Sequence, residues 1–401
     1  MFSCCGKNRQ NAGTLSNHVG TARNFRSFDT AMDATPEDST PDASSSGPRS
    51  LADYQRAALA QMSPEALGYI LGGAGDEITL TDNEAAWRRF ALRPRMLVGA
   101  SRCDPSVTLL GVQRAHPLIV APTAFQRLAH PDGELAIARA AAATDTVMCV
   151  STFASAGAAS VAECVPEVAR WFQLYALTDH GATRELIDDA ARRGYEALVV
   201  TVDRPVLGLR EREWRVSLRD PVADIPRQDP AQTPDVPAAA LYGQIDPDLS
   251  WSDIERFAVE SELPVLVKGI LTAEDAELAV AHGAAGVVVS NHGGRQLDTV
   301  LSGADALGPI VDAVAGRIDV IVDGGIRRGT DVVKALALGA RAVLVGRPVV
   351  WGLAVGGADG ARHVLETLLG EFVNALALVG CPRAADLDAS FVTPAPWAGG
   401  R

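Results

Sequence analysis

The chain has 401 residues, of which 47% are hydrophobic and 21% charged, so it can bury a sizeable core and is neither fibrous nor wholly disordered. Its formal net charge of -13 argues against a nucleic-acid partner, because no run of Lys and Arg supplies the basic surface that phosphates require. No apolar run approaches the ~20 residues of a membrane helix, and the first residues lack the apolar core of a secretory signal. We therefore expect a cytoplasmic protein with neither a membrane nor a nucleic acid as partner.

The cysteines form no CxxC pair and show no metal-ligand spacing with histidine. Free cysteine is readily buried in protein interiors. We expect reduced, mostly packed thiols and no metal site; the residues are Cys4, Cys5, Cys103, Cys149, Cys164 and Cys381.

Residues 1–50 are rich in Ser, Thr, Asn, Asp, Gly and Pro and carry few large apolar side chains. Because such a segment cannot offset the entropy of ordering, we predict a disordered tail. A transit peptide is a competing interpretation, since acidic residues are absent before Asp29, but the apolar face of such peptides is missing. An N-terminal helical segment follows the tail, because Ser63-Pro64 is typical of a helix start and Gly72-Gly73 of a helix end.

From residue 118 onward, short apolar runs alternate with alanine-rich segments of helical period. Continuous apolar strands joined by helices indicate a parallel sheet that is buried on both faces. About eight such units predict an α/β fold of the (β/α)8 TIM-barrel type within residues 51–385, with residues 386–401 as a C-terminal tail. A doubly wound open sheet is the competing architecture. The apolar runs are LIVAP, VMCVS, WFQLY, ALVVTVD, PVLVKG, GVVVSNH, DVIVDGG and AVLVGRP.

One segment breaks this alternation. Residues 217–250 are rich in Pro and Asp without periodicity, and they are longer than most loops in a compact domain. We predict a mobile lid loop over a site.

Each predicted strand ends in a polar, charged or glycine cluster. Active sites of such barrels lie at the carboxyl ends of the strands. Solvated loop starts explain some of these clusters, but not polar residues that the strand period still counts as strand, such as Gln173, Thr201 and Lys268. We therefore expect a ligand in the mouth of the barrel.

The last two strand ends predict a phosphate site. DGGIRRG and VGRP combine backbone amides next to glycine with Arg327 and Arg347, at the position where such barrels bind phosphate. A lone DGG would be interpreted as a turn, but a second Gly-Arg at the next strand end favours phosphate binding. The ligand would then carry a phosphomonoester.

Lys268 ends the run PVLVK, where its charge needs an anionic partner. A structural ion pair is one interpretation. The functional one is a fixed cation beside a group that becomes negative during a reaction, such as the pyrimidine edge of a reduced flavin.

His292 follows a strand and is flanked by glycines that let a ligand approach, which is the placement of a general base. Arg295 offers a bidentate fork for a carboxylate. Asp203 ends another strand, and a carboxylate can orient an imidazole and stabilise its protonated form. Together with the phosphate site, these residues point to redox chemistry on a small hydroxy acid.

SNHGGRQLD, residues 290–298, resembles the active-site signature of the FMN-dependent α-hydroxy-acid oxidases and dehydrogenases, the group that contains glycolate, lactate and hydroxymandelate oxidases. The similarity extends from about residue 51 to about residue 381 and implies the barrel rather than the open sheet. Further matching stretches are APTAFQRLAHPDGE, FQLY, VVTVDRP, LVKG, DGGIRRGTDVVKALALGA and VGRP.

The resemblance implies a role for each matching residue. His292 would be the catalytic base, with Asp203 as its partner and Tyr175 near the substrate hydroxyl. The substrate carboxylate would be held by Tyr69, Arg210 and Arg295. FMN would be held by Pro122, Thr123, Ala124, Ser151, Gln173, Thr201, Lys268, Ser290, Asp323, Gly324, Gly325, Arg327, Gly346 and Arg347.

Two departures from the family pattern concern the substrate pocket and the lid. Phe153 stands where glycolate oxidases carry tryptophan, which resembles the hydroxymandelate oxidases and favours an aromatic substrate over lactate or glycolate. Arg210 lies in GLREREW where many relatives have GRRxxD, so Leu209 and Glu213 are altered beside it.

The resemblance implies oxidation of an (S)-2-hydroxy acid to the 2-oxo acid, with dioxygen as the acceptor and hydrogen peroxide as the second product. His292 would take a proton from the α-carbon, or from the hydroxyl as a hydride leaves for the flavin. A dehydrogenase with another acceptor is an alternative. So is a nucleotide dehydrogenase of the inosinate type, which would need a nucleophilic cysteine at a strand end. Relatives of this family are often tetramers, so we expect a homotetramer.

Overall fold

The computed structural model describes residues 47–216 and 242–397. The predicted tail therefore lies outside the described residues except for 47–50, and so does the predicted lid except for 242–250. Ser50 caps the first helix by accepting a hydrogen bond from the backbone N–H of Asp53 at 3.2 Å, so the folded unit begins at the last residues of the predicted tail.

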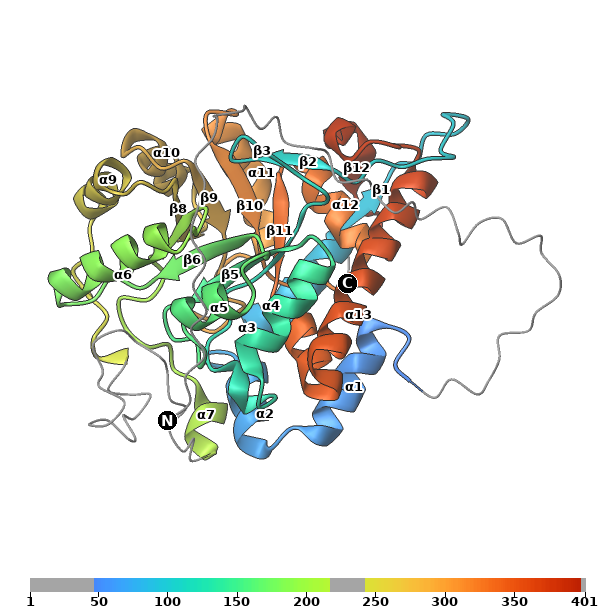
Figure 1. Cartoon of the computed structure of the whole chain (residues 1–401). Helices are drawn as coiled ribbons and strands as arrows, with labels where there is room; N and C mark the ends of the chain where they lie inside the picture. The colour runs from blue at the N-terminus through green and yellow to red at the C-terminus, as the bar shows by residue number, and fades with distance from the viewer. Residues whose placement is uncertain (1–46, 217–241, 398–401) are drawn as a thin grey trace, which may run out of the picture. The chain divides into compact units, whose positions relative to one another are not determined.

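Eight parallel strands close into a barrel, as the sequence predicts, and helices surround it (Figure 1). Closure occurs where β11 pairs with β4 in the register Val343 to Leu118. All eight predicted apolar runs are barrel strands. They are β4 (Leu118–Val120), β5 (Val147–Ser151), β6 (Arg170–Leu174), β7 (Leu198–Thr201), β8 (Val265–Ile270), β9 (Gly286–Val289), β10 (Asp319–Val322) and β11 (Ala342–Val345).

The helices of the barrel follow its strands in sequence. The longest, α13, bends at Gly356 and Gly357, whose backbone angles are not helical, and packs against both α1 and α4. These helices are α4 (Gly133–Ala143), α5 (Ala158–Cys164), α6 (His180–Arg192), α7 (Glu211–Arg215), α9 (Trp251–Glu260), α10 (Ala273–Ala281), α11 (Gly303–Val314), α12 (Gly329–Ala337) and α13 (Arg347–Val379).

Additional elements flank the barrel. Three helices precede it, namely α1 (Leu51–Gln61), α2 (Pro64–Leu71) and α3 (Ile78–Ala86). The hairpin of β2 (Val107–Leu109) and β3 (Val112–Arg114) places Leu109 against the side chains that fill the barrel interior. A second short sheet joins β1 (Phe90–Leu92) to β12 (Val392–Pro394), so the fold continues past the predicted boundary at residue 385.

The barrel core is filled by branched and aromatic side chains, as its continuous apolar strands predict. Inside the barrel, Trp171 and Leu266 are almost fully buried, together with smaller residues from every strand. A larger core between strands and helices contains Phe172, Phe372 and many Val and Ala residues. This packing fixes the strand ends, which is where the polar side chains emerge.

Within the described ranges, none of the helices has the length and apolar character that crossing a bilayer requires.

Candidate functional site

A cavity lies at the carboxyl ends of the barrel strands and is open to solvent. Most of the predicted site residues line it: Tyr69, Pro122, Thr123, Ala124, Ser151, Gln173, Tyr175, Thr201, Arg210, Lys268, His292, Arg295, Asp323, Gly324, Gly325, Arg327, Gly346 and Arg347.

Three predicted residues lie behind the cavity lining rather than in it. Asp203 and Ser290 contact lining residues, as described below. Phe153 is fully buried, with its ring stacked on that of Tyr175 at 5.2 Å between centroids. It packs in an aromatic cluster with Phe125 and does not itself form the cavity wall. The local sequence could not distinguish a side chain in the cavity wall from one behind it, because the strand end alone does not fix the direction of the next side chain.

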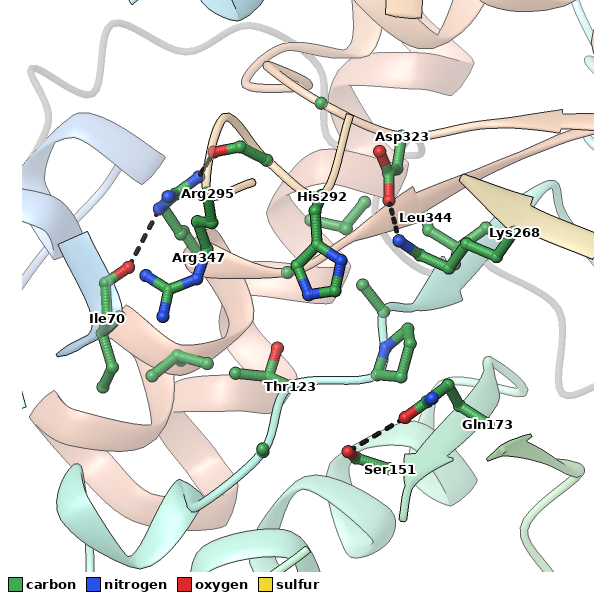
Figure 2. Close-up of a pocket in the computed structure, with 18 of the residues that line it drawn as sticks. Ile70, Thr123, Ser151, Gln173, Lys268, His292, Arg295, Asp323, Leu344 and Arg347 are labelled. Carbon is green, nitrogen blue, oxygen red and sulfur yellow. Dashed lines mark hydrogen bonds and ion pairs between the residues drawn. The ribbon is translucent and has the colours of Figure 1, made fainter. Parts of the chain in front are cut away.

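His292 occupies the middle of the cavity, between Arg295 and Arg347 on one side and Lys268 on the other (Figure 2). Its Nδ1 lies 2.8 Å from Oδ1 of Asp203. Burial lowers the pKa of His292 to about 4, although the Asp203 carboxylate opposes this effect. The imidazole is therefore neutral at neutral pH, donates its Nδ1 proton to Asp203 and keeps a lone pair on Nε2.

The loop that carries His292 is strained. His292 has a φ of 60°, and Gly293 and Gly294 also have positive φ, so three successive residues are left-handed. Such strain persists only where surrounding contacts determine it, and it is concentrated at functional sites. Asn83 on α3 provides one of these contacts by exchanging two amide hydrogen bonds, of 2.7 and 2.9 Å, with Asn291.

Arg210 and Arg295 form a pair beside His292. Nη2 of Arg295 donates to Oε1 of Glu213 at 2.8 Å, and Nη1 of Arg210 reaches the same oxygen at 3.3 Å. Glu213, one of the altered residues in the sequence, thus neutralises one of two neighbouring buried cations. The guanidinium of Arg295 also lies over the ring of Tyr69, 4.8 Å from its centroid. Burial raises the pKa of Tyr69, so its hydroxyl stays protonated and can donate a hydrogen bond.

Tyr175 is close to the free nitrogen of the base, with its hydroxyl 3.4 Å from Nε2 of His292. The phenol and the imidazole therefore face the same small volume. A substrate hydroxyl placed there would contact both groups.

Lys268 forms an ion pair with Asp323, 3.2 Å from its Oδ2, and donates to Oγ of Ser290 at 2.8 Å. Burial opposes its charge, but the carboxylates of Asp323 and Asp203 outweigh that effect and raise the pKa of Lys268. A bulge between Lys268 and Ile270 interrupts the pairing of β8 with β9, and at Gly269 a Cβ would lie 2.6 Å from that of Asp203. The sequence Lys-Gly thus makes room for the carboxylate.

The predicted phosphate end is strongly cationic. Arg347 donates to the backbone carbonyls of Ile70 and Gly293 at 3.0 Å each. Burial, reinforced by the positive charges of Arg295 and Arg327, lowers the pKa of Arg347 to about 9. Neighbouring cations that disfavour one another in this way are stabilised by a bound anion.

Of the eleven buried side-chain polar atoms that lack a hydrogen-bond partner among the described residues, five belong to residues that line the cavity. They are Nε2 of Gln173, Oγ1 of Thr201, Nη2 of Arg204, Oδ1 of Asp323 and Nε of Arg327. Because desolvated donors and acceptors are costly when unpaired, the four atoms outside Arg204 fit a large polar ligand such as the ring edge and phosphate of FMN.

Glycines let α3 pack closely against the loop that borders the cavity. Gly324 and Gly325 have φ of 94° and 75°, and the backbone of α3 approaches Gly325 so closely that a Cβ would lie 1.8 Å from the carbonyl oxygen of Asn83. Only glycine can adopt this conformation at such a contact. The loop after β10 therefore has its fixed shape before any ligand binds.

The prediction from sequence omitted Arg204. It lines the cavity and directly follows Asp203 in the quoted stretch VVTVDRP. Its position after a strand end was the signal that could have identified it. Other lining residues that the sequence did not single out are Ile70, Ala121, Gly293, Ile326, Leu344, Val345 and Val350.

No cysteine lines the cavity within the part of the chain that the structure describes. Cys149 faces the barrel interior, where burial raises the pKa of its thiol. Neither Cys149 nor the exposed Cys164 can serve as the nucleophile that an inosinate-type dehydrogenase needs. Residues 47–216 and 242–397 also contain no cluster of three or more His, Cys, Asp or Glu side chains that could hold a metal ion.

A closed parallel barrel whose mouth combines several arginines, a buried lysine and a neutral imidazole has the features expected of a flavin-binding oxidoreductase of the (β/α)8 class. Comparison with known proteins agrees with this class. The model of the FMN-dependent dehydrogenase family matches residues 58–394, and the chain belongs to that family, with FMN as its cofactor.

Several relatives match over nearly their whole length. An L-lactate oxidase of Nostoc sp. is 46% identical over 359 residues, which cover 86% of this chain and 98% of the relative. The human 2-hydroxyacid oxidase 2 is 44% identical over 85% of this chain and 97% of its own. Among solved structures, mandelate oxidase with (S)-4-hydroxymandelic acid has 42% identity and a TM-score of 0.80, covering 86% of this chain and 98% of that one.

Proposed function

We propose that this enzyme oxidises an (S)-2-hydroxy acid to the 2-oxo acid and passes the two electrons to dioxygen, which is released as hydrogen peroxide. The observation that carries this proposal is the neutral His292, held by Asp203 at 2.8 Å, in the same cavity as the Arg210 and Arg295 pair. Oxidases of lactate, of 2-hydroxy acids and of mandelate among the similar proteins support it.

The arginine pair retains donors for a carboxylate. A guanidinium has five N–H groups. Arg295 uses three of them, on the backbone carbonyls of Tyr69 and Gly72 and on Glu213. Among the described residues nothing accepts from its Nε, so Nε and the remaining hydrogen on Nη2 form a fork that suits one carboxylate.

Proton removal falls to His292. With its Nδ1 proton directed to Asp203, Nε2 accepts the proton of the substrate, and the carboxylate of Asp203 stabilises the imidazolium that forms. Tyr175, 3.4 Å from Nε2, would hold the substrate hydroxyl next to the base. The proton comes from the α-carbon or from the hydroxyl, and both positions lie within reach of a substrate held by its carboxylate.

FMN, when bound, accepts the two electrons of the oxidation. Lys268 presents a fixed positive charge to the ring edge, while Gln173 and Thr201 offer polar atoms that lack partners in the described residues. Arg327 and Arg347 hold the phosphate. Pro122, Thr123 and Ala124 line the same cavity and would contact the flavin ring.

Substitution of His292 by Ala tests the reaction. Under anaerobic conditions, substrate should bleach the flavin absorbance of the wild-type enzyme, and the variant should do so at least about 10²-fold more slowly. Unimpaired bleaching in a variant that still binds FMN would show that His292 is not the base.

Dioxygen is the proposed acceptor, with another acceptor as the alternative. In air-saturated buffer without added dyes, one hydrogen peroxide should form for each 2-oxo acid. Product formation that requires an added dye would favour the dehydrogenase.

An aromatic acid such as mandelate or 4-hydroxymandelate is the proposed substrate, with lactate as the second choice. The structural similarity to mandelate oxidase supports this choice. Phe153 contributes through Tyr175, on which it stacks, rather than by direct contact. Steady-state rates with glycolate, lactate, 2-hydroxyoctanoate and mandelate would rank the candidates.

A cytoplasmic homotetramer is the proposed assembly. The side chains of Met96, Leu97 and Val98 are 69%, 104% and 45% exposed in succession, and such an apolar loop is better covered by a second copy of the chain. Sedimentation and cell fractionation would test the two parts of this proposal.

A further inference from the structure

Arg204 is a buried cation in the wall of the substrate cavity. It follows β7 and Asp203, it is only 5% exposed, and it lines the cavity together with Tyr175 and Arg210. Placing a guanidinium in such surroundings is costly unless its charge and its donors are matched.

Aromatic rings surround the guanidinium. Its carbon lies 3.9 Å from the ring centroid of Tyr242, 5.1 Å from that of Tyr175 and 5.9 Å from that of Phe153. Ring faces attract a cation but do not neutralise it, and apart from the hydroxyl of Tyr175 these rings offer no hydrogen-bond acceptor to its N–H groups. Tyr242 belongs to the described end of the segment predicted as a lid, so the cation is held between that segment and the barrel.

Three of the other arginines of the cavity pair with carboxylates, whereas Arg347 donates to backbone carbonyls. Arg210 and Arg295 share Glu213, and Arg327 pairs with Glu84 at 2.7 Å. By contrast, no carboxylate among residues 47–216 and 242–397 forms an ion pair with Arg204, and its Nη2 is buried without a hydrogen-bond partner.

The adjacent carboxylate does not fill this gap. Asp203 directs Oδ1 to His292, and its Oδ2 also has no partner in the described part of the chain, so the two neighbouring side chains do not meet. The hydroxyl of Tyr175 hydrogen-bonds the guanidinium, but it is not a carboxylate. An acceptor for Nη2 must come from outside the described residues.

We propose that Arg204 binds a second carboxylate at the far end of the substrate, so that the preferred substrates are 2-hydroxy acids whose side chain, aromatic in the best case, ends in an anionic group. The first carboxylate already has its fork at Arg295. A planar guanidinium pairs best with a carboxylate, and the rings around Arg204 suit an aromatic linker between the two ends. This proposal rests on the proposed function, because it assigns the other end of the same substrate.

A pair of substrates of equal shape tests it. 4-Carboxymandelate carries the second carboxylate, and 4-carbamoylmandelate replaces it with a flat neutral group. The wild-type enzyme should prefer the carboxylate by about tenfold to a hundredfold in kcat/KM, the range expected for a charge-assisted hydrogen bond. In Arg204→Met the preference should vanish, and in Arg204→Lys it should be reduced but remain.

The ratio of the two kcat/KM values is taken within each variant, so partial loss of folded enzyme does not change it. Arg139→Met is the matched control, because the Arg139 side chain is 53% exposed on α4, away from the cavity. It should keep the wild-type ratio.

Two results would overturn the proposal. One is a wild-type enzyme that does not distinguish the two acids. The other is an Arg204→Met enzyme that loses activity on both by the same factor, which would mean that Arg204 acts through Tyr175 rather than on the substrate.

A failure of the proposed function would look different, since neither acid, nor mandelate itself, would bleach the flavin of any variant. In that case the two corresponding 2-oxo acids, titrated against the wild-type and Arg204→Met holoenzymes by flavin absorbance, still measure the preference at equilibrium. Equal dissociation constants in the wild-type enzyme would then refute the role of Arg204.

Discussion

His292 and Asp203 lie 89 residues apart in the chain, yet Nδ1 of the imidazole is 2.8 Å from Oδ1 of the carboxylate. The two side chains are only 18% and 12% exposed. Burial opposes the ionisation of Asp203, but the interaction with His292 and the charges of Lys268 and Arg204 outweigh this effect and lower the pKa of the carboxyl. An ionised acceptor on Nδ1 fixes the tautomer that leaves Nε2 free to act as a base.

The first prediction concerns this tautomer. Asp203→Asn keeps the size of the side chain, but an amide nitrogen can donate to Nδ1 and so place the imidazole proton on Nε2. We expect anaerobic flavin bleaching to slow by about 10²- to 10⁴-fold with little change in FMN content. A rate within threefold of wild type would mean that the carboxylate only packs against the ring.

The pH dependence follows from the burial of the base. Because burial lowers the pKa of His292 to about 4, the imidazole is in its active, neutral form above that pH. We expect kcat/KM to be flat from about pH 5.5 into the neutral range and to fall only near pH 4, rather than near the ordinary value of about 6.5. A slow substrate should be used so that chemistry limits the rate. An acid limb near pH 6.5 would show that the working base is solvated.

The sequence predicted the barrel well because its signals are local. Each of the eight apolar runs is buried on both faces, and each ends where a polar residue can reach the mouth, so strand and site are encoded together. The glycine-arginine pairs after β10 and β11 were informative for the same reason, since backbone conformation and charge are properties of adjacent residues.

Contacts between distant segments were not predictable in this way. Asn83 supports the loop of His292 from a helix 208 residues away from Asn291, and nothing in either stretch indicates the other. The sequence also did not indicate in which direction a side chain points. Phe153 turned into the aromatic cluster behind Tyr175, whereas Arg204 turned into the cavity, and both follow a strand end.

The cationic phosphate end makes a prediction about cofactor affinity. In Arg347→Ala the loss of a charged donor should raise the Kd for FMN by about tenfold to a hundredfold. Riboflavin lacks the phosphate and therefore provides the control, since its Kd should change much less. Quenching of flavin fluorescence on titration with apoenzyme measures both constants.

If Arg347→Ala weakened the binding of FMN and of riboflavin equally, the substitution would act through the backbone rather than through the phosphate. Arg347 also donates to the carbonyls of Ile70 and Gly293, so its loss could loosen the loop of the base. Arg327→Ala separates the two roles, because Nε of Arg327 has no partner among the described residues and its Nη2 already pairs with Glu84.

The last prediction concerns the packing of α3 against the loop after β10. A Cβ at Gly325 would lie 1.8 Å from the carbonyl oxygen of Asn83, and the φ of 75° is itself unfavourable for alanine by roughly 1–2 kcal/mol. Gly325→Ala should therefore lower the Tm of the apoenzyme by several degrees and weaken FMN binding, because the loop must move away from α3 to relieve the contact. Gly370→Ala is the matched control, since a Cβ there meets nothing within 4 Å and alanine favours its helix, α13. Calorimetry of both variants decides the point: if Gly325→Ala melts with Gly370→Ala and binds FMN as tightly, then the loop is not shaped by its contact with Asn83.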